Sequence, residues 1–179
     1  MFDADHITED ARRRIVAMLD EVLNVEYNLI ISSPRLVDRL IQIDKIPPEK
    51  IPTSLKRLGD DSMKHMGQSI HLVKTLGGEP HWGFEALEFL ADPIVVLQKQ
   101  LNLEKFAMET YRKAKKVADE NAVKGFPRAL KNFFPGTATG LSRTVVMEML
   151  EGMAKEEEIH IQLVNSTIKQ LEQLLPPKN

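Results

Sequence analysis

The sequence predicts an all-α protein, a bundle of four long helices that forms a single domain over residues 1–179. Three observations support this fold class. Aromatic residues are scarce (6%) and charged residues make up 28% of the chain, a composition that favours helices over strands. Prolines and glycines divide the chain into four long segments without strand-like alternation. The length of 179 residues is that of one ordinary globular domain.

Each segment carries apolar residues at helical spacing, so each predicted helix has one apolar face. The expected helices cover residues 8–42, 53–76, 93–122 and 141–175. Thr8 and Thr53 suit N-cap positions, and Pro93 suits the first turn of the third helix. Pro34 lies inside the first segment and predicts a kink or break there.

The connections predict how the helices are arranged. The first is short, about nine residues, so the first two helices are expected to be antiparallel. The second runs from Gly77 to Asp92, about 15 residues, and when extended it can reach roughly 50 Å at ~3.3 Å per residue. That reach is enough to run the length of a bundle, so we expect one long crossover between helices two and three.

Polar residues interrupt all four apolar faces near their middles. They are Glu26 in the first helix, Ser62 and His65 in the second, Glu104 in the third, and Glu157 and His160 in the fourth. At a rise of about 1.5 Å per residue, their depths match within each antiparallel pair, so they can meet in one layer. A charged side chain that faces an apolar core is costly unless it is paired, protonated or bound to a metal. Because the chain has no cysteine, any metal here must be bound by oxygen and nitrogen.

The fourth helix carries the most specific motif, Glu157-Glu158-Ile159-His160. Residues three apart leave the same face of a helix, so Glu157 and His160 can bind one metal cluster together. The alternative is a buried Glu–His ion pair that only fixes the helix register. Glu156 and Glu158 lie off this face and are expected to be solvated.

These residues resemble the ferritin-like di-iron carboxylate family, in which two helices each supply one Glu and two helices each supply Glu-x-x-His. Glu26, Glu104 and the Glu157–His160 motif match this pattern, and His65 matches the second histidine. Leu103-Glu104-Lys105-Phe106-Ala107 with Tyr111 looks like the third helix of rubrerythrin-type members. Met63-Lys64-His65 and Leu76-Gly77-Gly78-Glu79-Pro80 look like the second helix and exit of bacterioferritins.

One position departs from the family pattern, because Ser62 stands where a Glu is expected three residues before His65. Asp61 faces nearly the same way and is the substitute that the sequence offers. The resemblance therefore implies two iron ions, with the metal ligands Glu26, Asp61, His65, Glu104, Glu157 and His160. A mononuclear site, or manganese or zinc in place of iron, remains an open alternative. Haem is not expected, although Met63 matches its ligand in bacterioferritins, because a Met on a helix usually packs.

The resemblance implies oxidation of Fe(II) by oxygen or peroxide, in iron handling or oxidative-stress defence. A peroxidase of this kind would need a separate electron donor, because the chain has no rubredoxin-like cysteine module. The alternative function is a structural or interaction bundle whose metal site is degenerate or mononuclear. Tyr27 and Tyr111 are candidates for partners of the ligands, or else core aromatics.

The remaining expectations concern partners and location. The net charge of −2 predicts no nucleic-acid field, and no apolar run reaches the roughly 18–20 residues that a bilayer requires. The N-terminus does not resemble a secretory signal, so we expect a cytoplasmic protein. The residues after Leu175 offer no fifth helix, which favours a homodimer or small homo-oligomer over a large shell.

Overall fold

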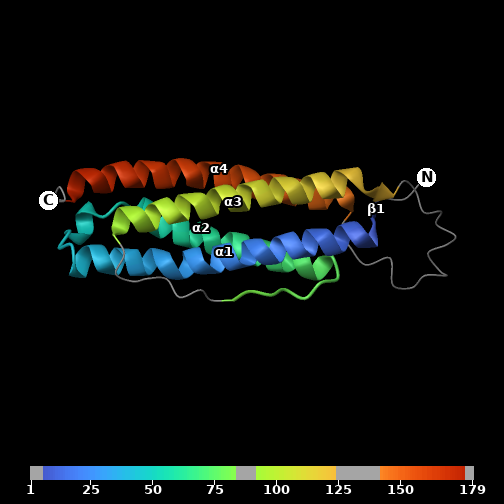
Figure 1. Cartoon of the computed structure of the whole chain (residues 1–179), viewed down its shortest axis with the longest axis horizontal. Coiled ribbons are helices and arrows are strands. Elements are labelled where there is room, and N and C mark those ends of the chain that lie inside the picture. The colour runs from blue at the N-terminus through green and yellow to red at the C-terminus, as the bar shows by residue number, and fades with distance from the viewer. Residues whose placement is uncertain (1–5, 84–91, 124–141, 176–179) are drawn as a thin grey trace.

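The computed structural model describes residues 6–83, 92–123 and 142–175, and these residues form an elongated all-α bundle (Figure 1). The prediction of four long helices is confirmed. They are α1 (Glu9–Gln42), α2 (Ser54–Thr75), α3 (Pro93–Glu120) and α4 (Arg143–Leu174). Short elements complete the described fold: a 3-10 turn (Pro48–Lys50), and the strands β1 (His6–Ile7) and β2 (Ala122–Val123), which pair antiparallel.

Local signals in the sequence explain where the helices begin. The Thr8 hydroxyl accepts a hydrogen bond from the Ala11 amide, and the Asp92 carboxylate accepts one from the Ile94 amide. Thr53 takes the N-cap position of α2, but its backbone is already helical and its side chain makes no capping bond. The caps at Thr8 and Asp92 each satisfy an amide that the helix itself leaves unbonded.

The sequence predicts a kink or break at Pro34, and the break is wrong because α1 continues through this residue to Gln42, whereas the kink stays a prediction. A proline inside a helix removes one backbone hydrogen bond and crowds the preceding turn. Here the residues on both sides of Pro34, Ser33 and Leu36, are buried against the rest of the bundle. Tertiary packing of the apolar face therefore outweighs the local penalty.

Two apolar clusters, one in each half of the bundle, show the directions of the helices. The first contains Ile15 of α1, Leu72 of α2, Ala118 of α3 and Val146 of α4. The second contains Leu40 of α1, Leu55 of α2, Leu97 of α3 and Leu171 of α4. Because the starts of α2 and α3 share one cluster and their ends share the other, α2 and α3 run parallel, with α1 and α4 antiparallel to them (Figure 1).

The chain between α2 and α3 must therefore return along the bundle. Its first part lies along α1, where the His81 amide donates to Asp20 Oδ1 (3.0 Å) and the Gly83 amide donates to Asn24 Oδ1 (2.6 Å). Residues 84–91, which hold half of the predicted crossover, lie outside the described residues. The ferritin-like form of this connection stays a prediction.

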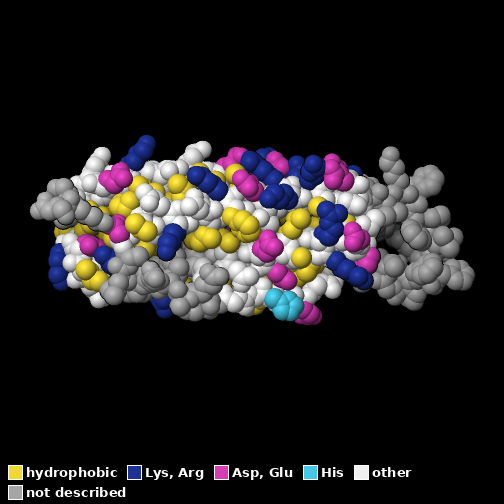
Figure 2. All heavy atoms as spheres, in the orientation of Figure 1, with side chains coloured by type: hydrophobic (Ala, Val, Ile, Leu, Met, Phe, Trp, Pro, Cys, Tyr) yellow, Lys and Arg dark blue, Asp and Glu magenta, His cyan; other side chains and the backbone are white. Residues whose placement is uncertain are grey.

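The surface carries both signs of charge. Figure 2 shows acidic and basic side chains interspersed on one face, with hydrophobic side chains exposed between them. Within the described residues, none of the helices is both long and apolar enough to cross a membrane.

Candidate metal centre

Five buried polar residues lie between the two apolar clusters, and every helix contributes at least one. Glu26 comes from α1, His65 from α2, Glu104 from α3, and Glu157 and His160 from α4. Each of these five residues is at most 2% exposed to solvent. Each helix brings its residue inward because buried residues lie one turn before and one turn after it, so the same face is buried along its length. The predicted meeting of these residues in one layer is confirmed.

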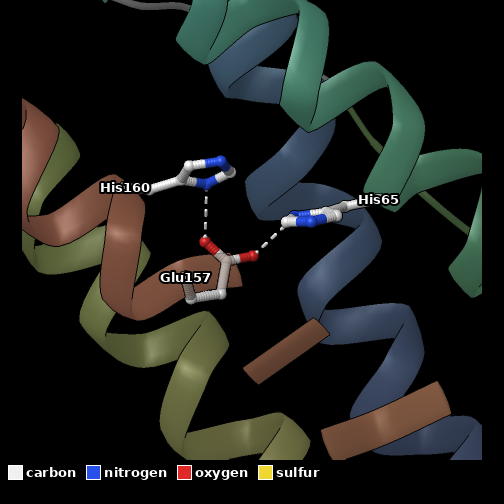
Figure 3. A group of neighbouring side chains, drawn as sticks. All are labelled: His65, Glu157 and His160. Carbon is white, nitrogen blue, oxygen red and sulfur yellow. Dashed lines mark hydrogen bonds and ion pairs between the residues drawn. The ribbon is translucent and has the colours of Figure 1, made fainter. Parts of the chain in front are cut away.

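Glu157 lies at the centre of this layer, between the two histidine rings (Figure 3). Its Oε1 is 2.8 Å from Nδ1 of His65, and its Oε2 is 3.1 Å from Nδ1 of His160. The two ring centroids are 5.1 Å apart. The three-residue spacing predicted the contact with His160, and the packing of α2 against α4 adds the contact with His65.

A second buried carboxylate approaches each histidine at the same nitrogen. Glu26 Oε1 is 3.5 Å from Nδ1 of His65, and Glu104 Oε2 is 3.4 Å from Nδ1 of His160. The layer therefore consists of two similar groups of one histidine and one carboxylate, and Glu157 belongs to both. We call these the α1–α2 half-site (Glu26 and His65) and the α3–α4 half-site (Glu104 and His160).

Several buried oxygen atoms of this layer have no hydrogen-bond partner among the described residues. They are Glu26 Oε2, Glu104 Oε1 and Ser62 Oγ. A buried acceptor without a donor costs about 1–3 kcal/mol, so each such atom requires an explanation. The carboxylate oxygens converge on the two histidines, which is the arrangement expected of metal ligands.

Burial and charge shift the protonation of these groups in the metal-free protein. Burial raises the pKa of Glu26 to about 7 and that of Glu104 to about 8, while the nearby imidazoles oppose the shift. Burial also disfavours the ionised form of Glu157. The contacts of this carboxylate with both histidines outweigh the effect of burial and hold the pKa of Glu157 well below the usual range. Burial by itself would lower the pKa of both histidines. The nearby carboxylates outweigh burial and raise the pKa of His65 to about 11 and that of His160 to about 10.

The group best placed to hold a metal ion is His65, Glu157 and His160. One donor atom from each of these residues lies within 4.8 Å of the others, and all three residues are buried. Imidazole nitrogen and carboxylate oxygen together suit iron, manganese and zinc, so the donors do not select one metal.

The sixth predicted ligand, Asp61, takes a different position. Its side chain is 31% exposed, and its Oδ2 is 3.2 Å from Nε2 of His160, the nitrogen on the other side of the ring from Glu157. The same Oδ2 lies 3.2 Å from Nε of Arg57. Direct metal ligation by Asp61 stays a prediction.

Two features of the site were missed or left open at the level of sequence. Glu156 was expected to be solvated, but its Oε2 is 2.7 Å from Nε2 of His65. Tyr111 is fully buried, and its hydroxyl lies 3.1 Å from Ser69 Oγ and 3.4 Å from Glu26 Oε1, so it is a partner of a predicted ligand. The position of Glu156 directly before Glu157 is the one signal that could have placed it near the layer.

No protein-family model, curated protein or solved structure matches this chain.

Proposed function

We propose that this chain is a ferritin-like protein that holds two metal ions, iron in the first place, and oxidises Fe(II) with oxygen or peroxide. The observation that carries the proposal is the position of Glu157 between Nδ1 of His65 and Nδ1 of His160. Each histidine has a further buried carboxylate at the same nitrogen. A role in iron handling or oxidative-stress defence in the cytoplasm is part of this proposal.

The residues fit two metal ions that share one carboxylate. Glu26 and His65 would hold one ion, Glu104 and His160 would hold the other, and Glu157, which lies between the two histidines, would serve both. The carboxylate oxygens without hydrogen-bond partners are then ligands, which accounts for their burial.

Two iron ions bound here would supply one electron each to oxygen or peroxide, and the anionic carboxylates would stabilise the ferric product. The chain's own residues prepare the site for this chemistry. The Tyr111 hydroxyl donates to Glu26 and holds its carboxylate in place. Burial of the layer excludes bulk water, which strengthens the attraction between carboxylates and cations.

Ser62 supports a second candidate function, a structural or interaction bundle with a mononuclear or degenerate site. Its side chain is fully buried in the layer, and its hydroxyl has no partner among the described residues. The resemblance places a carboxylate at this position, so the layer offers one negative charge fewer than the family pattern. Manganese or zinc is the alternative occupant within the same proposal.

Metal loading followed by oxygen consumption tests the proposal. The purified chain is loaded with Fe(II) without oxygen, desalted, and analysed for iron before oxygen is admitted. We expect about two iron ions per chain and rapid oxygen uptake. The double variant Glu157→Ala/His160→Ala should lose both, and Glu157→Gln provides a version with nearly unchanged volume.

The matched control is His71→Ala, because His71 is an exposed histidine of α2 outside the layer. It should bind iron as the unchanged protein does. Protein that remains metal-free after loading would contradict the proposal and favour the structural bundle. One ion per chain without oxygen uptake would favour a mononuclear site. The proposal also includes assembly into a homodimer and a separate electron donor. Gel filtration tests the assembly into a homodimer.

A further inference from the structure

A surface groove between α1 and α2 has no part in the proposed function so far. It encloses about 380 Å³, and residues of the segments 30–38 and 55–63 line it. The apolar residues of its lining are Ile30, Pro34, Val37, Leu55 and Met63. Ser33 of α1 and Gly59 of α2 also line it, so each helix presents one small residue to the groove.

The hydroxyl of Ser33 is buried at this groove without a partner. Ser33 is 2% exposed, and its Oγ has no hydrogen-bond partner among the described residues. A serine inside a helix commonly bonds to a carbonyl one turn back, as the neighbouring Ser32 does to the Leu29 carbonyl at 3.2 Å. A buried hydroxyl without a partner is costly, so the Ser33 hydroxyl can bind a small molecule that enters the groove.

A second buried hydroxyl, that of Ser62, lies farther along α2. Gly59, Ser62 and His65 are each three residues apart, so they share one helix face over about 9 Å of its axis. A Cβ at Gly59 would lie 3.4 Å from Ser33 Cβ, so α1 and α2 approach closely where this line of residues begins. Ser62 is 0% exposed, and its Oγ also lacks a partner within the described part of the chain. The line therefore leads from the groove to a histidine of the buried layer.

The other buried serine of α2 differs from these two. Ser69 lies one turn beyond His65, and its Oγ is 3.1 Å from the Tyr111 hydroxyl. Among the buried serines of the described residues, only Ser33 and Ser62 lack a partner, and both lie on the groove side of the layer. The unpartnered hydroxyls therefore follow the line from the groove and not the serines of the bundle in general.

The chemistry of this line favours a small neutral molecule that both donates and accepts hydrogen bonds. The charged residues of the groove, Asp38, Lys56 and Asp60, are all exposed, so they stay at its mouth. Farther in, an ion would lose its hydration without compensation from a charged group. Dioxygen is apolar and gains nothing from hydroxyls. Hydrogen peroxide is small and neutral, and it can both donate to and accept from each serine.

We propose that the α1–α2 groove is the entrance by which hydrogen peroxide reaches the buried layer, with Ser33 and Ser62 as the hydrogen-bonding positions along it. The role of peroxide as the oxidant rests on the proposed function, whereas the entrance itself does not. Both serines are closed to solvent, so passage depends on brief movements of the neighbouring side chains. The competing interpretation is that the small residues only allow α1 and α2 to pack closely.

Single cysteines test the entrance without metal, because the chain has no cysteine of its own. The variants Ser33→Cys, Ser62→Cys and Ser69→Cys are each treated with hydrogen peroxide in the presence of a chelator. The sulfur attacks one peroxide oxygen, the O–O bond breaks, and the products are a sulfenic acid and one water molecule. We expect the thiols at positions 33 and 62 to react at least about tenfold faster than the thiol at position 69, which is equally buried but lies beyond the layer.

A blocked groove provides the sharper comparison, because the reporter thiol stays the same. In the Ser62→Cys background, Gly59→Leu would place a bulky side chain beside Ser33 and should slow the reaction at least about tenfold. Gly67→Leu is the matched control, since Gly67 is an exposed glycine of α2 with nothing within 4 Å of its Cβ position. Circular dichroism checks the fold of each variant. If Gly59→Leu does not fold, Gly59→Ala replaces it, with a smaller but measurable delay expected.

The variant Ser33→Ala, with Ser32→Ala as its control, connects the entrance to the oxidant. In the iron-loaded protein, Ser33→Ala should slow oxidation by hydrogen peroxide roughly three- to tenfold, the effect of one lost hydrogen bond, and leave oxidation by dioxygen unchanged. Ser32→Ala removes a hydroxyl that bonds within its own helix, so it should change neither rate.

The outcomes separate this inference from the proposed function. Equal thiol rates at positions 62 and 69, or a rate at position 62 that Gly59→Leu leaves unchanged, would overturn the entrance whatever the metal content. Equal slowing of both oxidants by Ser33→Ala, or of neither, would overturn the assignment of peroxide. Protein that binds no iron would overturn the proposed function, and the thiol rates would still support or refute the entrance.

Discussion

Ser62→Glu would introduce the carboxylate that the family pattern places three residues before His65. Ser62 is 0% exposed, and its hydroxyl has no partner among the described residues. The new side chain would enter a layer where three buried carboxylates already face two imidazoles. Without metal, no further cation of the layer is available to pair with it, so we expect the variant to be less stable.

The magnitude follows from the burial of the site. An uncompensated charge in a protein interior costs about 3–5 kcal/mol. For a chain of this length, 1 kcal/mol lowers the melting temperature by about 2–4 °C, so the metal-free variant should melt about 6–20 °C lower. Metal at 100 times its dissociation constant stabilises the folded state by about 2.7 kcal/mol per site, so saturating metal should recover much of the loss.

Thermal unfolding followed by circular dichroism measures both effects, once with a chelator and once with excess Mn²⁺. Ser62→Gln is the control, because it adds a side chain of nearly the same volume without a charge. The Glu variant should lose more stability than the Gln variant in chelator and gain more on adding Mn²⁺. Equal losses in chelator, or equal gains with metal, would refute the reasoning that Ser62 lies among the metal ligands.

Two further predictions concern the metal-free protein. Burial raises the pKa of Glu26 to about 7 and that of Glu104 to about 8, so their stabilisation is complete near pH 4.5 and is lost as the pH rises through 7–8. The free energy of unfolding in chelator, measured by chemical denaturation, should fall between pH 5 and 8 by up to about 1.4 kcal/mol per pH unit for each group, and Glu104→Gln should flatten the slope; a flat profile in the unchanged protein would contradict this. Gly78→Ala should destabilise the fold by about 1–3 kcal/mol in chemical denaturation, because the added Cβ would lie 2.7 Å from Val16 Cγ1. Gly67→Ala, with nothing within 4 Å, should instead be neutral or stabilising by up to about 1 kcal/mol, and equal losses in both variants would count against the close packing at Gly78.

Much of the fold follows from local properties of the sequence. The observed bounds of the four helices lie within two residues of those predicted from the positions of proline and glycine and from helical periodicity. These signals act over one or two turns, so they can be recognised without knowledge of neighbouring helices. Pro34 is the exception, because its effect depends on how strongly the flanking residues are packed.

The candidate site was predictable to the extent that it interrupts apolar faces. Glu26, Glu104 and the Glu157–His160 pair replace apolar residues at positions that helical spacing turns inward, and the structure buries all of them. Periodicity identifies the face that a residue occupies and its approximate depth. For this reason the sequence alone placed three carboxylates and two imidazoles in one layer.

The partners within that layer could not be predicted in the same way. Glu156 was assigned to solvent because one residue step turns a helix by about 100° away from the buried face. The structure nevertheless places it beside His65 of α2, with 2.7 Å between Glu156 Oε2 and His65 Nε2. In the same way, Asp61 of α2 meets His160 of α4, with 3.2 Å between Asp61 Oδ2 and His160 Nε2. Helical spacing specifies which residues face inward. The rotation and axial offset of one helix against another depend on the packing of all four helices. The contacts of each histidine depend on this rotation and offset, so only the tertiary structure determines them.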